Sequence, residues 1–156
     1  MPAPTISYMI CTGALIVLIF TVQVFYLYVV DNIWAEMAKR ELKEITDYVS
    51  DTIANLYFLA NSTNADVSLE KILNLPLDVS GSSYSLAIQR DSQDFAQSVQ
   101  ASFNGKTWLK ATSWLPPGLK VNLTKNQIVE GSGKSAVVGC SRSSQSVYVW
   151  IAYKSG

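Results

Sequence analysis

The first part of the chain is a continuous apolar run. From Ile6 to Val30 it contains no Asp, Glu, Lys or Arg. An α-helix rises about 1.5 Å per residue, so about 20 apolar residues cross the hydrocarbon core of a bilayer. The run is long enough to cross with some tilt. It therefore predicts a membrane-spanning helix, which could be an export signal, a membrane anchor or the packing stalk of a polymer.

The flanks of this run favour a retained helix over a cleaved export signal. A secretory signal has a basic start, a shorter apolar stretch and a small-residue cleavage site. Here the first ten residues carry no Lys or Arg, and no such site follows Val30. Tyr26, Tyr28 and Trp34 cluster near its end, which is typical of an aromatic belt at the membrane interface. Gln23 is either a tolerated interfacial residue or a partner in a helix–helix hydrogen bond.

The helical pattern continues beyond the apolar run. Residues 31–60 contain no Gly and no Pro, and apolar residues recur at spacings of three and four. This periodicity predicts an amphipathic extension, so that one helix would run from about Thr5 to about Ala60 over about 80 Å. The apolar stripe consists of Leu42, Ile45, Val49, Ile53, Leu56 and Ala60. It needs a cover, which is either the protein's own head domain or the helices of neighbouring copies.

The composition changes after residue 64, where Ser, Thr, Val, Gly and Asn become common. Alternation through residues 84–88 predicts a strand. Asn104-Gly105 predicts a hairpin turn within residues 98–115. Residues 135–140 and 146–153 read as further strands, whereas residues 67–76 fit either a helical turn or a first strand.

Short strands separated by turn signals are typical of a small antiparallel β-sandwich. The sequence therefore predicts an α+β protein with two parts. Residues 1–60 would form the long N-terminal helix, with a transmembrane half and an amphipathic half. Residues 61–156 would form the β-sandwich head domain.

Composition argues against several classes of function. Twelve basic and twelve acidic residues give a net charge of zero, whereas a general nucleic-acid binder needs a basic surplus. The chain contains no histidine, the commonest general base and metal ligand. Cys11 in the apolar run and Cys140 near the far end are not expected to pair, and two cysteines fall short of a zinc or iron–sulfur set. We therefore expect no catalytic residues, no metal and no cofactor.

Two motifs that suggest chemistry are weak. Gly133-Lys134-Ser135 matches the end of a phosphate-binding loop, but the first glycine of that motif would fall at Ile128. A Gly-rich hairpin loop fits this stretch better. Asp91 and Asp94 could form a carboxylate pair for acid–base work or calcium, although a solvated loop is the simpler interpretation.

Two N-x-[ST] sequons begin at Asn61 and Asn122, and both fall where loops or strand ends are expected. Glycosylation at either site would require the head to lie outside the cell. Lys39, Arg40 and Lys43 follow the apolar run and, by the positive-inside rule, favour a cytoplasmic head. The sequons and the Ser/Thr-rich β domain favour an external one. We expect a cell-surface filament, or a plasma-membrane protein with an external head.

An apolar helix with an amphipathic extension and a small β head resembles the archaeal type IV pilin-like proteins. These include pilins, archaellins and the membrane-anchored β-sandwich proteins of the archaellum base. Residues 75–89, "LPLDVSGSSYSLAIQ", also look like the proline–glycine–tyrosine segment that leads into a strand in many such heads. The resemblance implies that apolar helices bundle in a filament core and that heads form the outer shell.

On this resemblance, the first hypothesis is a structural filament subunit whose partners are copies of itself, with membrane lipid around it before assembly. The second is a membrane-anchored accessory protein that binds another cell-surface, archaellum or secretion component, and the third is an ectoenzyme. The residues assigned to helix packing and assembly are Ile16, Ile19, Gln23, Leu42, Ile45, Val49, Ile53 and Leu56.

Overall fold

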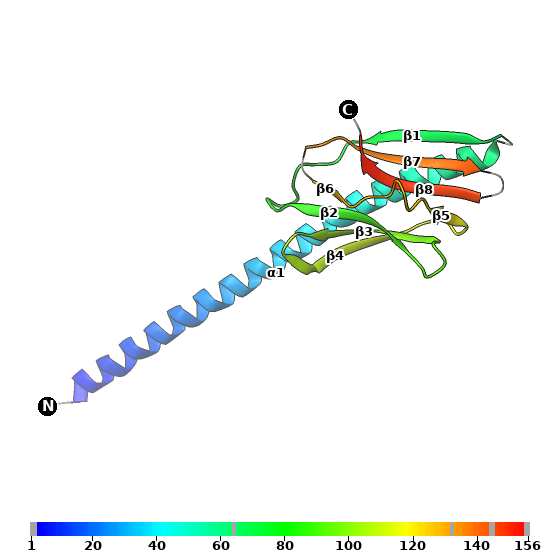
Figure 1. Ribbon diagram of the computed structural model, residues 1–156. Helices are drawn as coiled ribbons and strands as arrows, with labels where there is room; N and C mark the ends of the chain where they lie inside the picture. Colours follow the sequence, from blue (N-terminus) through cyan, green and yellow to red (C-terminus); the bar gives the residue numbers. More distant parts are fainter. Residues whose placement is uncertain (1–2, 64, 132, 144–145, 155–156) are drawn as a thin grey trace. The chain divides into compact units, whose positions relative to one another are not determined.

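The computed structural model of the protein describes residues 3–63, 65–131, 133–143 and 146–154 (Figure 1). The chain forms two compact units, Met1–Glu36 and Met37–Gly156. Helix α1, Ala3–Ser62, makes up the described part of the first unit and continues into the second. The predicted α+β class and the predicted long helix are both confirmed. Residues 37–62 of this helix belong to the same compact unit as the strands, which we call the head.

Eight strands of the head form two four-stranded sheets, in the orders β1-β7-β8-β5 and β4-β3-β2-β6 (Figure 1). The strands are β1 Val67–Leu73, β2 Tyr84–Arg90, β3 Ala96–Phe103, β4 Lys106–Trp114, β5 Leu119–Val121, β6 Val129–Glu130, β7 Ala136–Ser143 and β8 Ser146–Tyr153. The stretch left open between helical turn and strand is therefore strand β1. The predicted hairpin joins β3 to β4, and its Gly105 takes a positive φ of 94°.

The pairing departs from the sequence-based prediction at two places. β5 pairs with β8 in parallel, while the other strand pairs are antiparallel. The Gly-rich stretch after β6 is not a hairpin loop, because β6 and β7 lie in different sheets. Glycines indicate a tight turn but do not specify which strand the next one pairs with. Gly131 in this crossover is needed for packing, since a Cβ there would lie 2.5 Å from Cε1 of Tyr84.

The core of the head lies between the inner faces of the two sheets and is completed by α1. The alternation predicted for β2 is confirmed, with Tyr84, Leu86 and Ile88 buried. Most of the apolar stripe of α1 is buried as well. Its members Leu42, Ile45, Val49, Ile53 and Ala60 are buried and Leu56 is half-buried. The sequence left two possible covers for this stripe, the protein's own head or the helices of neighbouring copies. The structure shows that the head covers it.

Trp150 of β8 is buried although it alternates with the inward-facing Val149 and Ile151. It pairs across strands with Gly139, where a Cβ would lie 2.1 Å from Cζ2 of the indole. The ammonium of Lys125 lies 4.6 Å from the centre of the ring. The missing side chain of Gly139 thus makes room for the indole to lie against β7, and a cation–π contact accompanies it.

Arg142 of β7 caps the end of α1. Its guanidinium donates hydrogen bonds to the backbone oxygens of Asn61, at 2.9 Å, and of Thr63. The last turn of α1 contains no basic residue of its own. Arg142 therefore supplies the positive charge that the carbonyl end of a helix favours, and it ties that end to the sheet.

Candidate functional site

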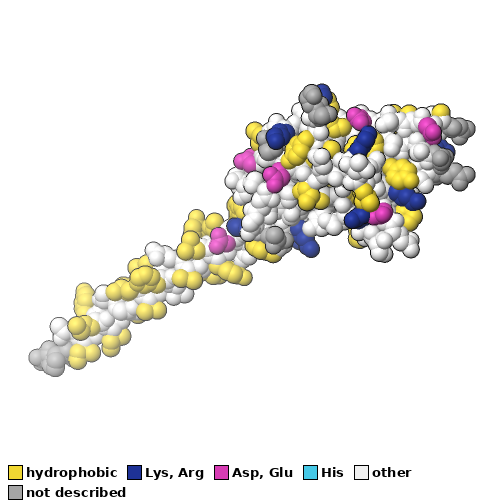
Figure 2. Space-filling model, viewed as in Figure 1, with side chains coloured by type: hydrophobic (Ala, Val, Ile, Leu, Met, Phe, Trp, Pro, Cys, Tyr) yellow, Lys and Arg dark blue, Asp and Glu magenta, His cyan; other side chains and the backbone are white. Residues whose placement is uncertain are grey.

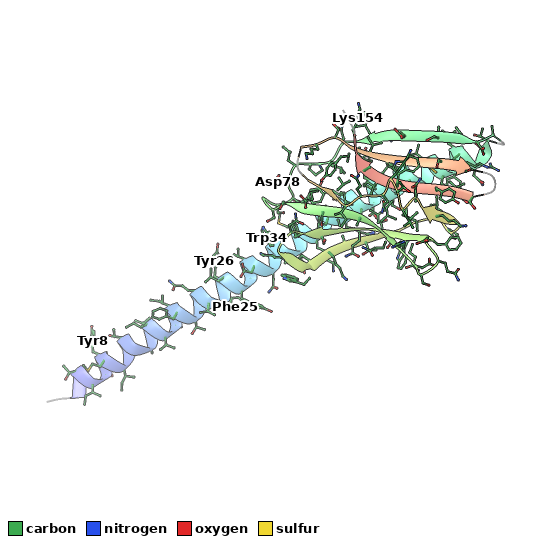
Figure 3. All side chains as sticks on the ribbon, in the orientation of Figure 1. Tyr8, Phe25, Tyr26, Trp34, Asp78 and Lys154 are labelled. Atoms are coloured by element: carbon green, nitrogen blue, oxygen red, sulfur yellow. The ribbon has the colours of Figure 1, made fainter. Side chains whose placement is uncertain are left out.

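The apolar half of α1 is exposed along its length. Every side chain of residues 5–28 is exposed, from Ile16 at 49% to Tyr8 at 80% among the large apolar side chains of that segment. Hydrophobic side chains cover its visible face, whereas the Lys, Arg, Asp and Glu side chains in view lie on the second unit and near its start (Figure 2). Tyr8, Phe25 and Tyr26 project outward from the helix (Figure 3). Within the described part of the chain, nothing covers this surface.

This half of α1 is long and apolar enough to cross a membrane, by length and composition. It is the one helix among the described residues that meets this criterion. Such a helix close to the N-terminus suggests membrane anchoring or a secretion signal. Tyr26 and Tyr28, assigned to the interface belt, are exposed on it, and Trp34 is half-buried.

Two hydroxyl groups in the segment are satisfied within the helix. The Thr12 hydroxyl donates to the backbone oxygen of Tyr8, and the Thr21 hydroxyl donates to that of Val17, at 2.8 Å in each case. Such bonds lower the cost of placing hydroxyls in an apolar environment. The exposed amide of Gln23 cannot be satisfied in this way as readily, so it remains a candidate for a hydrogen bond to another helix.

The residues assigned to helix packing fall into two groups that the structure does not bring together. Ile16, Ile19 and Gln23 are exposed on the apolar half. Leu42, Ile45, Val49 and Ile53 are buried in the head, with Leu56 half-buried. The second group packs α1 against its own strands, so of the residues assigned to helix packing only the first group is available to other molecules.

The edge strand β4 is held to α1 by side chains of the helix. Lys43 donates to the backbone oxygen of Thr112 at 3.0 Å and to Asp47 Oδ1 at 2.7 Å. Ser50 donates to the backbone oxygen of Trp114 at 2.7 Å. The hydrogen bond from Lys43 is the main cause that lowers the pKa of Asp47 below its ordinary value. These contacts satisfy carbonyl groups that an edge strand otherwise leaves open to another chain.

Two exposed tryptophans on β4 were missed in the sequence analysis. Trp108 is 70% exposed and Trp114 is 75% exposed. Both lie at even-numbered positions of the strand, with the exposed Lys110 between them, and so share its outward face. The alternation of the segment after Gly105 could have revealed them, because Leu109, Ala111 and Ser113 occupy the opposite, buried face.

A groove of about 360 Å³ opens between α1 and the segment that precedes β2. Its residues are Glu41, Glu44, Ile45, Tyr48, Asn74, Leu75, Pro76, Asp78 and Val79. Ser80 donates to Glu41 Oε2 at 3.1 Å and holds the segment against the helix. The groove therefore combines an apolar lining with three carboxylates.

The two sequons lie in different environments. Asn61 is exposed in the last turn of α1, so the loop expected there is replaced by helix. Asn122 follows β5, as predicted, and lines a groove of about 630 Å³. Its Oδ1 accepts hydrogen bonds from the backbone N–H groups of Thr124 and Lys125, at 3.2 and 3.3 Å. This side chain thus organises the turn after β5.

The carboxylates considered for chemistry have structural partners. Asp91 Oδ1 accepts from the backbone N–H groups of Gln93 and Phe95 at 2.9 Å each, and Asp94 pairs with Arg90. Both cysteines are free, with Cys11 exposed and Cys140 buried. Among the described residues, no three His, Cys, Asp or Glu side chains lie together as a metal site.

Comparison with protein-family models, with curated proteins and with solved structures gives no match to this chain. The architecture itself, a long N-terminal apolar helix followed by two β-sheets, is consistent with a type IV pilin-like fold. The proline–glycine–tyrosine segment forms a local unit. The Tyr84 hydroxyl donates to the backbone oxygen of Pro76 at 2.8 Å, and Gly81 between them has a positive φ of 74°.

Proposed function

We propose that the protein is a non-enzymatic structural subunit of a type IV pilus-like surface filament. In this filament the apolar halves of α1 pack against one another in the core, and the β heads face the solvent outside the cell. Membrane lipid surrounds the apolar half before assembly, and copies of the same chain replace the lipid afterwards.

The observation that supports this proposal is the division of α1 into two surfaces. The head buries the stripe of the second half, whereas residues 5–28 of the first half are exposed on all sides. In a simple membrane anchor, lipid covers the apolar segment at all times. In a filament subunit, lipid covers the same segment before assembly and neighbouring helices cover it afterwards, and the pilin-like architecture supports this second use.

Packing of the apolar halves contributes to the free energy of assembly. Burial of about 1,000 Å² of apolar surface per subunit contributes about 25 kcal/mol before the cost of association. Transfer from lipid instead of water reduces this contribution, because lipid tails are as apolar as the side chains. Close packing between complementary helix surfaces and the few polar side chains then favour neighbouring copies over lipid.

The same surface also fits a second function, that of a membrane-anchored accessory protein. Here the apolar half stays in lipid, and the head binds another surface or motor component. The satisfied hydroxyls of Thr12 and Thr21 suit lipid as well as they suit a helix bundle. The two functions differ in whether Ile6–Val30 faces protein or lipid.

Negative-stain microscopy of fibres sheared from the cell surface, with mass spectrometry for this chain, separates the two functions. A filament subunit is the main component of the fibres, in an amount that scales with fibre length. An accessory protein remains in the membrane fraction. Recovery of this chain only from membranes of cells that bear fibres would refute the filament proposal.

Leu18→Arg provides a second test. A charge in the middle of the apolar half prevents its burial in lipid or in a bundle, at a cost of about 2.5–3.5 kcal/mol or more. We expect this variant to lose fibres completely. If the accessory function holds instead, the released head still binds its partner, which a pull-down from the soluble fraction detects.

A further inference from the structure

The head presents two different flanks on either side of α1. One flank follows β4 and contains Lys39, Lys106, Trp108, Lys110 and Trp114, which we call the β4 flank. The other is the carboxylate-bearing groove, which we call the groove flank. All of these residues belong to the compact unit Met37–Gly156.

The β4 flank is basic and aromatic. Lys43 and Ser50 place the helix beside Thr112 and Trp114, so this side of α1 faces β4. Lys39 lies one turn before Lys43 on that same side of the helix and is exposed. Because Asp47 neutralises Lys43, the positive charge used here comes from the exposed Lys39 of α1 and the exposed Lys110 of β4.

The groove flank is acidic and lies on another side of the helix. At about 100° per residue, Glu41, Glu44 and Tyr48 lie about 140–200° around the helix axis from Lys39. The contact of Ser80 with Glu41 and the lining residues from the segment before β2 fix this side independently. Glu44 and Asp78 are exposed, so their charges are accessible to another molecule.

We propose that the β4 flank of one copy of this chain docks into the groove flank of the next copy. An exposed indole of β4 enters the apolar-lined groove, and Lys110 lies beside the carboxylates of Glu44 and Asp78. The groove volume of about 360 Å³ is larger than an indole side chain. The indole N–H group donates hydrogen bonds and accepts none, and a carboxylate is a stronger acceptor for it than a neutral group.

A second copy is the occupant that the two flanks themselves indicate. Their charges are opposite, and both flanks lie along the same stretch of the head, from residue 39 to residue 50 of α1. Because the two flanks lie on different sides of α1, one pair of copies cannot make the contact twice, so the contact is heterologous and repeats from head to tail without closing into a dimer. This is the geometry that a filament needs, so the inference rests on the proposed function and gives that function a specificity-determining contact.

Charge reversal in cells that form fibres tests this contact. Lys110→Glu and Glu44→Lys each place like charges together, and we expect about ten-fold fewer fibres for either variant. The double variant restores the opposite charges, so fibre number should return towards that of the wild type. Lys71→Glu at an exposed position of β1 is the matched control and should leave fibre number unchanged. Equal fibre numbers in all variants would overturn the proposed contact while leaving the filament function standing.

Cysteine cross-linking in intact membranes does not depend on fibres. In a Cys11→Ser background, Lys110→Cys combined with Glu44→Cys should give a ladder of disulfide-linked species beyond the dimer. Lys71→Cys combined with Glu44→Cys is the control and should give no ladder. A ladder without fibres would keep the contact and refute the filament, whereas no ladder above the control, or products that stop at the dimer, would overturn the contact.

Discussion

At the scale of single residues, two glycines decide how the largest aromatic side chains of the head pack. Gly139 leaves room for the indole of Trp150, and Gly131 leaves room for the ring of Tyr84. Neither contact is visible in the sequence, because each joins residues from separate parts of the chain. Alternation along β8 places Trp150 on the side opposite Val149 and Ile151, but it does not show that a neighbouring glycine allows the indole to be buried.

Gly139→Ala tests the first of these contacts. The added Cβ would lie 2.1 Å from the indole, so the ring or the strand must shift. We expect the free energy of unfolding of the head to fall by about 1–3 kcal/mol in chemical denaturation followed by tryptophan fluorescence. Gly13→Ala is the control, since nothing lies within 4 Å of its added Cβ. If both variants unfold at the wild-type denaturant concentration, the close contact at Trp150 is wrong.

Two buried titratable groups predict how the stability of the head depends on pH. Burial raises the pKa of Cys140 from 9.0 to about 11 and that of Tyr84 from 10.0 to about 12. In the unfolded chain both groups lose their protons at lower pH than in the folded chain. Their contribution is therefore complete below pH 9 and is lost as the pH rises to 12.

The expected loss is about 1–3 kcal/mol for each group over this range. Urea unfolding at a series of pH values measures it. Cys140→Ala should remove the part of the decline that begins near pH 9 and leave the part that Tyr84 causes between pH 10 and 12. A wild-type profile that stays flat from pH 9 to 12 would mean that these side chains are hydrated in the folded protein.

At the scale of elements, α1 was the most predictable part of the molecule and its second half the most ambiguous. A charge-free run and a stripe at spacings of three and four are strong local signals, and the predicted helix is confirmed. The cover of the stripe could not be predicted, because periodicity shows that a face is buried without showing what buries it. The hairpin loop predicted between β6 and β7 was wrong for the same reason, since strand pairing depends on distant parts of the chain.

A pair of matched variants tests the division of α1 into a head-packed and an exposed half. Leu42 is fully buried, so Leu42→Ala should lower the free energy of unfolding of the head by about 2–5 kcal/mol. Leu18 is 59% exposed, and Leu18→Ala should leave that value unchanged in detergent. Thermal unfolding followed by circular dichroism of the strands compares the two. Equal effects would show that the second half of α1 does not pack in the head.

At the scale of the whole molecule, the candidate site was predictable only in part. The apolar run identified the exposed surface of α1, and Ile16, Ile19 and Gln23 lie on it. The β4 and groove flanks were not predictable, because they combine the helix with strand and loop residues that are far apart in the sequence. Lys43 and Thr112, or Glu41 and Ser80, meet only in the folded head.

In the assembled filament, Gln23 is expected to stabilise the contact between neighbouring helices. In a filament core its amide can hydrogen-bond to a neighbouring helix, with a contribution of about 0.6–2 kcal/mol per copy. Gln23→Leu should therefore reduce the resistance of fibres to heat or detergent, as judged by the monomer released on gels. Thr21→Val, which removes a hydroxyl bonded within its own helix, is the control and should have no such effect. Equal release from the two variants would place Gln23 away from the helix contacts.

The most direct test of the account is a helical reconstruction by cryo-electron microscopy of fibres sheared from the cells. We predict that residues 6–30 of neighbouring copies pack against one another at the fibre axis, with the two β-sheets of each head on the outside. Fibres whose core is formed by another polypeptide, with this chain found only in the membrane, would contradict the account.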